Sequence, residues 1–244
     1  MLHRGAVALL GLASCGRIAF DATGGDASVP VADASGQSGD AAQPACNFAT
    51  PSLVQRSCAA NTASTATVAL PASITAGNVL FVVVNIDSTS ANATVTDSAG
   101  NTMQRGMTVR SASSTVTLFS ASITNAGLDE LTVTLDDVAG FTAIFAHEVT
   151  GVRAVAESIS QSGVGTAATT PPLSTSVANT LLFGSVVSSD SVTSVGPGFA
   201  SLQDCAGDRT AYALAAAPGS YAATYTIGTA TDWLATLTAF SPCI

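Results

Sequence analysis

The chain has 244 residues, a formal net charge of −9 and a charged fraction of only 9%. The seven basic residues are all arginines, which excludes chemistry that needs a lysine side chain. Because the acidic excess is spread along the chain, no basic stripe is available for phosphates, and nucleic acid is not an expected partner. Hydrophobic residues reach 47%, largely through Ala and Val. With abundant Ser, Thr and Gly, they favour half-buried strands over exposed helices.

Residues 1–15 have the layout of an export signal. Met1 to Arg4 carry positive charge, and Gly5 to Ala13 form an apolar segment. That segment is too short to span a bilayer, which needs about 20 residues. The sequence therefore predicts a signal peptide that ends at Cys15.

The four residues LASC, 12–15, resemble the lipobox of bacterial lipoproteins. In that family the cysteine is acylated and becomes the first residue of the mature chain. The resemblance implies that Cys15 carries lipid and attaches the protein to the cell envelope. Gly16 stands where some inner-membrane lipoproteins carry Asp, which points to the outer membrane. The alternative is cleavage by the ordinary signal peptidase, which accepts small residues such as Ala13 and Cys15 at its site.

Residues 16–45 are predicted to be a disordered linker. From Asp21 to Ala45 the chain has four Asp, no basic or aromatic residue, and no periodic apolar face. Such a segment cannot bury enough surface to offset the entropy lost on ordering. A flexible coil of about 30 residues has a root-mean-square span on the order of 30 Å. We expect it to hold residues 46–244 clear of the membrane.

The folded part contains four cysteines, an even number that suits two disulfides in an exported chain. We expect Cys46 to pair with Cys243, because the first and last strands of a closed sandwich often lie side by side. That pairing leaves Cys58 for Cys205. A local bridge between Cys46 and Cys58 remains an alternative. No C-x-x-C motif is present, so a metal site is not expected.

Apolar runs of strand length recur through the folded part and are separated by turn sequences such as DSAGN and TNAG. No window of helix length has a clean apolar stripe with caps, so we expect few helical residues. The expected strands are 52–57, 65–70, 78–86, 93–96, 115–121, 130–135 and 141–149, with further strands from 173 onward.

An internal repeat is visible when these runs are aligned. The segment ASITAGNVLFVVV at 72–84 is similar to STSVANTLLFGSVV at 174–187, and residues 114–149 are similar in pattern to 209–240. Neither half could cover its own apolar face alone, so we expect the two halves to form two antiparallel sheets packed face to face. The expected fold is thus an all-β, two-sheet sandwich with jelly-roll or Greek-key connections, built from two related halves.

The segments AGNVLFVVV, VTDSAGNTM, TLFSA, ELTVTL and HEVTGV resemble β-sandwich domains of many uncharacterised bacterial surface and secreted proteins. This similarity covers most of residues 50–240. Its motifs are turns and core strands, so the resemblance implies a fold and surface exposure without a particular activity.

Candidate catalytic groups are few. His147 is the only histidine outside the signal segment, and Gly151 stands where an H-E-x-x-H motif needs its second histidine. A strand would place the neighbouring Glu148 on the opposite face. No G-x-S-x-G motif is present. We therefore expect neither an enzyme nor a cofactor. A hydrolase remains an alternative that would need His147 in a cleft beside a Ser or Asp.

Several aspartates lie near expected turns, where Asp commonly forms Asx turns. Calcium held by loop oxygens is the alternative interpretation. These residues are Asp97, Asp136, Asp137, Asp190, Asp204, Asp208 and Asp232.

Sugar binding would need exposed aromatic platforms. The candidates are Trp233, Tyr212, Tyr221 and Tyr225, although Trp233 opens an apolar strand and is expected to pack against the core. The sequence favours a membrane-anchored, non-enzymatic protein that contacts protein or glycan at the cell surface through its hairpin loops. A carbohydrate-binding module is the alternative.

Overall fold

The structure is a computed structural model, and it describes residues 46–244 except residues 129 and 138. The expected signal peptide with Cys15 and the expected linker at 16–45 lie outside the described residues. Residues 46–244 belong to one compact unit. Their regular structure consists of strands, and none of it forms a helix that could span a lipid bilayer. The expected all-β class is confirmed.

The strands of the described part alternate with short turns along the whole sequence. They are β1 (Ser52–Asn61), β2 (Thr65–Ala69), β3 (Val79–Ile86), β4 (Ala93–Asp97), β5 (Gln104–Arg110), β6 (Thr115–Ser122), β7 (Glu130–Leu135), β8 (Thr142–Thr150), β9 (Val152–Thr169), β10 (Leu173–Thr175), β11 (Thr180–Ser188), β12 (Val192–Val195), β13 (Ala200–Cys205), β14 (Asp208–Ala215), β15 (Gly219–Tyr221) and β16 (Thr224–Pro242).

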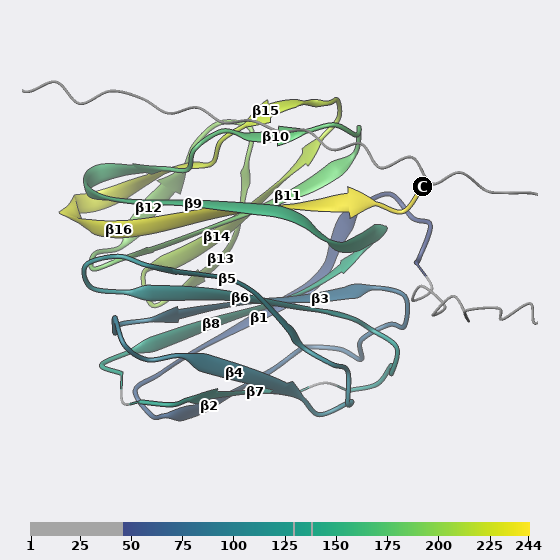
Figure 1. The fold of residues 1–244 in the computed structure, drawn as a ribbon, viewed down its shortest axis with the longest axis horizontal. Helices are drawn as coiled ribbons and strands as arrows, with labels where there is room; N and C mark the ends of the chain where they lie inside the picture. The colour runs from purple at the N-terminus through teal and green to yellow at the C-terminus, as the bar shows by residue number, and fades with distance from the viewer. Residues whose placement is uncertain (1–45, 129, 138) are drawn as a thin grey trace, which may run out of the picture. The chain divides into compact units, whose positions relative to one another are not determined.

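These strands form antiparallel sheets that lie in successive layers (Figure 1). A three-stranded sheet, β2-β7-β4, covers one face of the five-stranded sheet β1-β8-β3-β6-β5. The other face of that sheet packs on a six-stranded sheet, β12-β16-β11-β14-β13, with β9 paired to β16. The pair β10-β15 lies beyond it. The described residues therefore form a layered β-sandwich with more than the two sheets that were expected, because each large sheet is also covered on its other face.

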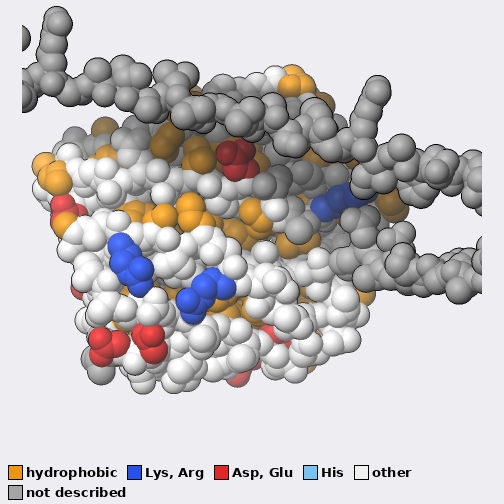
Figure 2. Space-filling model, viewed as in Figure 1, with side chains coloured by type: hydrophobic (Ala, Val, Ile, Leu, Met, Phe, Trp, Pro, Cys, Tyr) orange, Lys and Arg blue, Asp and Glu red, His pale blue; other side chains and the backbone are white. Residues whose placement is uncertain are grey.

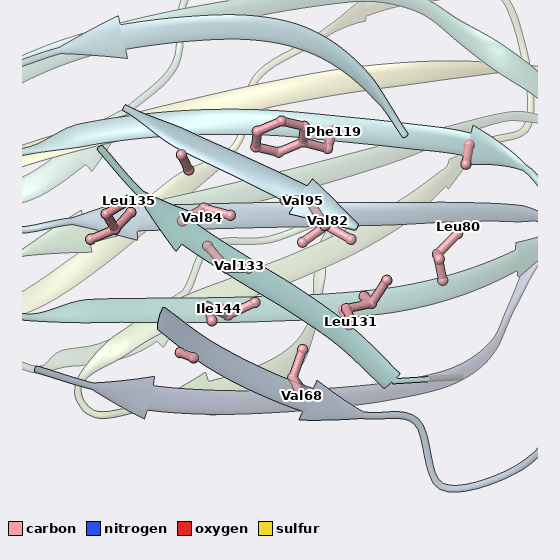
Figure 3. Close-up of a cluster of buried hydrophobic side chains, with 14 of the residues drawn as sticks. Val68, Leu80, Val82, Val84, Val95, Phe119, Leu131, Val133, Leu135 and Ile144 are labelled. Atoms are coloured by element: carbon pink, nitrogen blue, oxygen red, sulfur yellow. The ribbon is translucent and has the colours of Figure 1, made fainter. Parts of the chain in front are cut away.

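The first core layer lies between the three-stranded and the five-stranded sheets. All eight residues of β3 are buried, and alternate ones, including Leu80, Val82 and Val84, point into this layer. Leu131 and Val133 of β7 face them, as Figure 3 shows. Because β3 is covered on both faces, its sequence is a continuous apolar run instead of an alternating one.

The second core layer lies between the five-stranded and the six-stranded sheets. The remaining alternate residues of β3, among them Phe81 and Val83, point into it. The Phe81 ring meets Phe183 of β11 and Phe240 of β16 edge-on, with centroids 5.0 Å apart in both pairs. Edge-to-face contacts of this kind contribute beyond their buried area. Phe81 therefore fixes how the two large sheets sit on each other.

The two large sheets have corresponding strand orders. The order β1-β8-β3-β6-β5 in one sheet matches β9-β16-β11-β14-β13 in the other, each strand being replaced by the one eight places later. The sequence echo of 72–84 and 174–187 falls on the central strands β3 and β11. The long strand β16 has a register shift between Thr226 and Thr231, and it pairs with β12 before the shift and with β11 after it.

Two strands, β5 and β9, were not predicted from the sequence. Both lie at sheet edges and pair with one neighbour along most of their length. The residues of β5 are exposed or half-buried, and β9 contains Gly163 and Gly165. An edge strand buries less of its surface, so it carries a weaker apolar pattern for sequence analysis to detect.

A disulfide joins Cys46 to Cys243, as expected. A second joins Cys58 to Cys205, so the local alternative is not the one formed. The reason given for the first pairing was wrong, however, because β1 pairs with β8 and not with β16. The two ends instead meet at the connection between β8 and β9, where the Cys243 amide donates to the Gly151 carbonyl.

Gly151 is required at this junction by both conformation and space. Its φ is +72°, and a Cβ there would lie 2.2 Å from the Ala49 carbonyl oxygen. We expect Gly151→Ala to lower the free energy of unfolding by at least about 2 kcal/mol in urea denaturation. Gly127→Ala is the matched control, because its φ is also positive but nothing lies within 4 Å of the new Cβ. Equal stability of the two variants would contradict the steric argument.

Candidate functional site

Two pairs of polar side chains are buried in the second core layer, and each pair joins the two large sheets. Asn85 and His147 come from the five-stranded sheet, and Asp208 and Thr210 come from β14 of the six-stranded sheet. All four are at most 3% exposed. Buried polar groups cost free energy unless they are paired, so these residues are candidates for a role beyond packing.

A hollow of about 280 Å³ opens beside this layer, near the ends of β3 and β11 and the turn between β13 and β14. Asn85, Asp208 and Ser114 provide its buried polar lining. The carboxylate residue Asp87 is exposed beside them, and Phe141 and Val187 supply apolar wall. The hollow therefore has a mainly polar lining with an apolar wall on one part of it.

Asp208 is placed by a two-residue hairpin turn. Cys205 and Asp208 are cross-strand partners, and Ala206 and Gly207 between them have φ values of 55° and 96°. Two successive positive φ values are typical of the type I′ turn that joins tightly paired strands. Because Cys205 is also bonded to Cys58 of β1, the turn that carries Asp208 is tied to both large sheets.

The Asp208 carboxylate accepts two hydrogen bonds at 3.1 Å, one from the Ser188 amide to Oδ1 and one from Asn85 Nδ2 to Oδ2. Burial raises its pKa to about 7, and these two hydrogen bonds oppose the shift only in part. The charges of Asp204 and Asp87 raise the pKa further. Asp208 therefore changes charge near neutral pH, and although it lies beside a turn as expected, its carboxylate accepts from Ser188 and Asn85 instead of forming an Asx turn.

Asn85 makes one of the hydrogen bonds available to its side chain. Its Nδ2 donates to Asp208, but its Oδ1 is buried with no hydrogen-bond partner in the described structure. An amide oxygen left unpaired in this way costs about 1 to 3 kcal/mol. Asn85, a lining residue of the hollow, therefore keeps an unused acceptor.

His147 lies in the packed interior, away from solvent. It is fully buried, its ring meets Phe183 with centroids 4.4 Å apart, and Nε2 lies 3.3 Å from the Thr210 hydroxyl. Burial lowers its pKa to about 3, so the imidazole is neutral at physiological pH. Thr210 is equally buried. The described geometry therefore gives a substrate no route to this pair.

Glu148 faces the opposite side of β8 from His147, as the strand pattern predicts. It is fully buried, and Oε1 accepts from the Thr75 amide at 2.9 Å and from Asn78 Nδ2 at 2.6 Å. Oε2 accepts from Gln55 Nε2 at 2.6 Å. Three donors thus compensate the buried carboxylate, and Glu148 links β1, β8 and the segment before β3. The isolated acid in the apolar run FTAIFAHEV was the sequence signal for this role.

The aromatic candidates form no exposed platform. Trp233 and Tyr225 are buried, and burial also raises the pKa of Tyr225. Tyr212 and Tyr221 are half-buried, and the Tyr221 hydroxyl donates to the Ala217 carbonyl at 2.7 Å. The expectation that Trp233 packs against the core is confirmed.

Of two other loop aspartates, Asp97 holds a turn as expected, whereas Asp136 joins two segments that are far apart in the chain. Asp97 Oδ1 accepts from the Ala99 amide two residues on, which is an Asx turn, and from the Gly100 amide at 3.0 Å. Asp136 accepts from the Asn92 amide at 2.7 Å and from Asn92 Nδ2 at 2.8 Å. The hydrogen bonds from Asn92 lower the Asp136 pKa. These two carboxylates are therefore occupied by structural contacts.

Among the described residues, no group of three or more His, Cys, Asp or Glu side chains gathers in a way that could hold a metal ion. Comparison of the chain with protein-family models, with curated proteins and with solved structures finds no match. The function is therefore inferred from the sequence and from the geometry of the site.

Proposed function

We propose that the chain is a surface-anchored, non-enzymatic β-sandwich lipoprotein with a binding, adhesion or structural role in the cell envelope. The observation that supports this most is the pair of disulfides in the described domain. Disulfides form and persist in oxidising compartments outside the cytoplasm. They agree with the export signal and with the lipobox-like sequence that ends at Cys15.

We further propose that the domain is built from two related halves with jelly-roll or Greek-key connections. The corresponding strand orders of the two large sheets support this, as does the sequence echo on their central strands. On this proposal the halves pack through the second core layer. The polar hollow then lies where residues of the two halves meet.

The lipid on Cys15 would attach the chain to a membrane, with the outer membrane as the proposed location. Partners at the cell surface would be protein or glycan, contacted through exposed loops. The face in Figure 2 supports contact with uncharged surfaces, because its few charged side chains leave larger uncharged areas between them where grey atoms do not cover it. Nucleic acid is not among the proposed partners.

The two alternatives have less support. A carbohydrate-binding module would use exposed aromatic rings, whereas Trp233 and Tyr225 are buried. A hydrolase would use His147 in a cleft, whereas that side chain is enclosed between sheets. Binding by loops or by the polar hollow is therefore the proposed mode of action.

Acylation of Cys15 is the first test of this proposal. We expect mass spectrometry of the native protein to find an N-terminal peptide that begins at Cys15 and carries more than one acyl chain, because a single chain anchors only marginally. Cys15→Ala should move the protein from the membrane fraction to the soluble fraction. Ser14→Ala, which keeps the cysteine and a small neighbour, should leave it membrane-bound. An unmodified N-terminus at Gly16 or later would refute the anchor.

A further inference from the structure

The lining of the hollow offers hydrogen-bond acceptors without a cation to match them. Each Asp208 oxygen accepts one hydrogen bond and retains capacity for another, and Asn85 Oδ1 has no partner. Asp87 adds a second carboxylate. The adjacent Arg209 does not neutralise this charge, because its guanidinium forms an ion pair with Asp204 at 2.7 Å. A ligand for this hollow should therefore be positively charged and rich in donors.

An organic cation suits the hollow better than a metal ion. Calcium takes six to eight oxygen ligands, whereas no group of three metal-ligating acidic, His or Cys side chains occurs among the described residues. The volume of about 280 Å³ is also much larger than one ion needs. Phe141 and Val187 would instead contact an alkyl chain. Apolar surface of this kind commonly covers the alkyl stem of a basic side chain.

We propose that this hollow binds an alkylguanidinium or alkylammonium group, with its charged end at Asp208 and Asn85 and its alkyl stem against Phe141 and Val187. The proposal deepens the binding role proposed above and rests on it, because a surface arginine or lysine of a partner would present this chemistry. The chain itself contains no lysine, and its net charge of −9 favours the approach of a basic partner.

The test titrates the full-length protein with butylguanidinium chloride at pH 8, above the Asp208 pKa of about 7. Backbone amide NMR shifts report binding, with the Ser188 amide as the direct reporter because it donates to Asp208. For a ligand of this size we expect a dissociation constant of about 1 mM. Neutral butanol at the same concentration should not shift this amide. Calcium chloride is the competing probe.

Variants assign the binding to the hollow. Asp208→Asn should weaken butylguanidinium binding at least about tenfold, because it removes a charge-assisted contact while keeping the shape of the side chain. Asp87→Asn alters an exposed residue and should weaken binding less, without a risk to folding. Glu130→Gln, which removes an exposed carboxylate on β7, should leave the dissociation constant unchanged.

The source of the cation is resolved by a capped Ala-Ala-Arg-Ala-Ala peptide. Binding comparable with that of butylguanidinium supports a protein partner, and binding of the small cation alone supports a free amine. The proposal is overturned if Ser188 does not respond, if Asp208→Asn binds as tightly as the unaltered protein, or if calcium binds more tightly than butylguanidinium. Any of these results with Cys15 acylation intact would remove the cation site and leave the anchored lipoprotein standing.

Discussion

Replacing both Cys58 and Cys205 with Ser is expected to lower the free energy of unfolding by about 4 kcal/mol. In the unfolded chain with the Cys46–Cys243 bridge intact, the Cys58–Cys205 bridge closes a loop of about 50 residues, which runs through both ends of the domain. Removing the bridge opens this loop and raises the entropy of the unfolded chain. The double replacement avoids a free thiol. Urea denaturation of oxidised protein at a fixed pH measures the change.

The local consequence distinguishes this disulfide from the other one. Cys58 lies on β1 and Cys205 on β13, which are edge strands of the two large sheets. A hydrogen bond at 3.2 Å from Arg56 Nε to Gln203 Oε1 also joins these strands, but an exposed contact of this kind contributes little. We therefore expect faster amide hydrogen exchange in β1 and β13 once the bridge is removed.

The variant with Cys46 and Cys243 replaced by Ser is the control. It removes a bridge that lowers the entropy of the unfolded chain by a comparable amount. The local loosening, however, should occur at the two ends of the described domain, near Gly151. The same exchange pattern in both variants would show that neither bridge acts locally. A loss below about 1 kcal/mol for the Cys58–Cys205 pair would contradict the expected role of that bridge in limiting the unfolded state.

Central strands were predictable because their sequence pattern is governed by burial. Strand β3 was expected at 78–86 and is found at 79–86, and β8 was expected at 141–149 and is found at 142–150. Both are covered on two faces, so β3 is apolar except at Asn85, and β8 contains the apolar run 143–146. The edge strands β5 and β9 lack this constraint, which is why composition alone did not predict them.

The hollow was not predictable, because its residues come together only through long-range pairing. Asn85 and Asp208 are separated by 123 positions in the chain, and Asp208 stands directly after Gly207, where an aspartate is typical of a turn. One signal was present in the run VLFVVVNI, where Asn85 interrupts an apolar strand. Buried polar residues of this kind usually have partners, but which residue serves as partner depends on how the two large sheets stack.

Asp208→Asn is expected to change how stability depends on pH. The Asp208 pKa is about 7 in the folded chain and 3.8 as its ordinary value. Between these values the folded state binds more protons than the unfolded state, so the stability supplied by this group is present below about pH 4 and lost as pH rises through 7. A shift of that size corresponds to roughly 4 kcal/mol. The Asp208→Asn variant has no titrating carboxyl at this position, so its stability does not fall for this reason as pH rises.

The experiment compares the free energy of unfolding of the two proteins from pH 4 to pH 8. The difference, variant minus unaltered protein, should increase by roughly 4 kcal/mol across the range, whatever its value at pH 4. His147 acts with the opposite sign, because its folded pKa of about 3 lies below its ordinary 6.5 and its contribution is lost as pH falls. It is present in both proteins, so subtraction removes its effect.

Asp190→Asn provides the matched control for this pH profile. Hydrogen bonds from Thr229 and from the Ser191 amide lower the Asp190 pKa below 3.8, so its contribution to stability varies only at more acid pH. Its difference curve should therefore be flat between pH 4 and pH 8. A flat curve for Asp208→Asn as well would mean that water or a counter-charge reaches Asp208 in the folded chain. Its carboxylate would then be ionised at neutral pH without the cost that burial imposes.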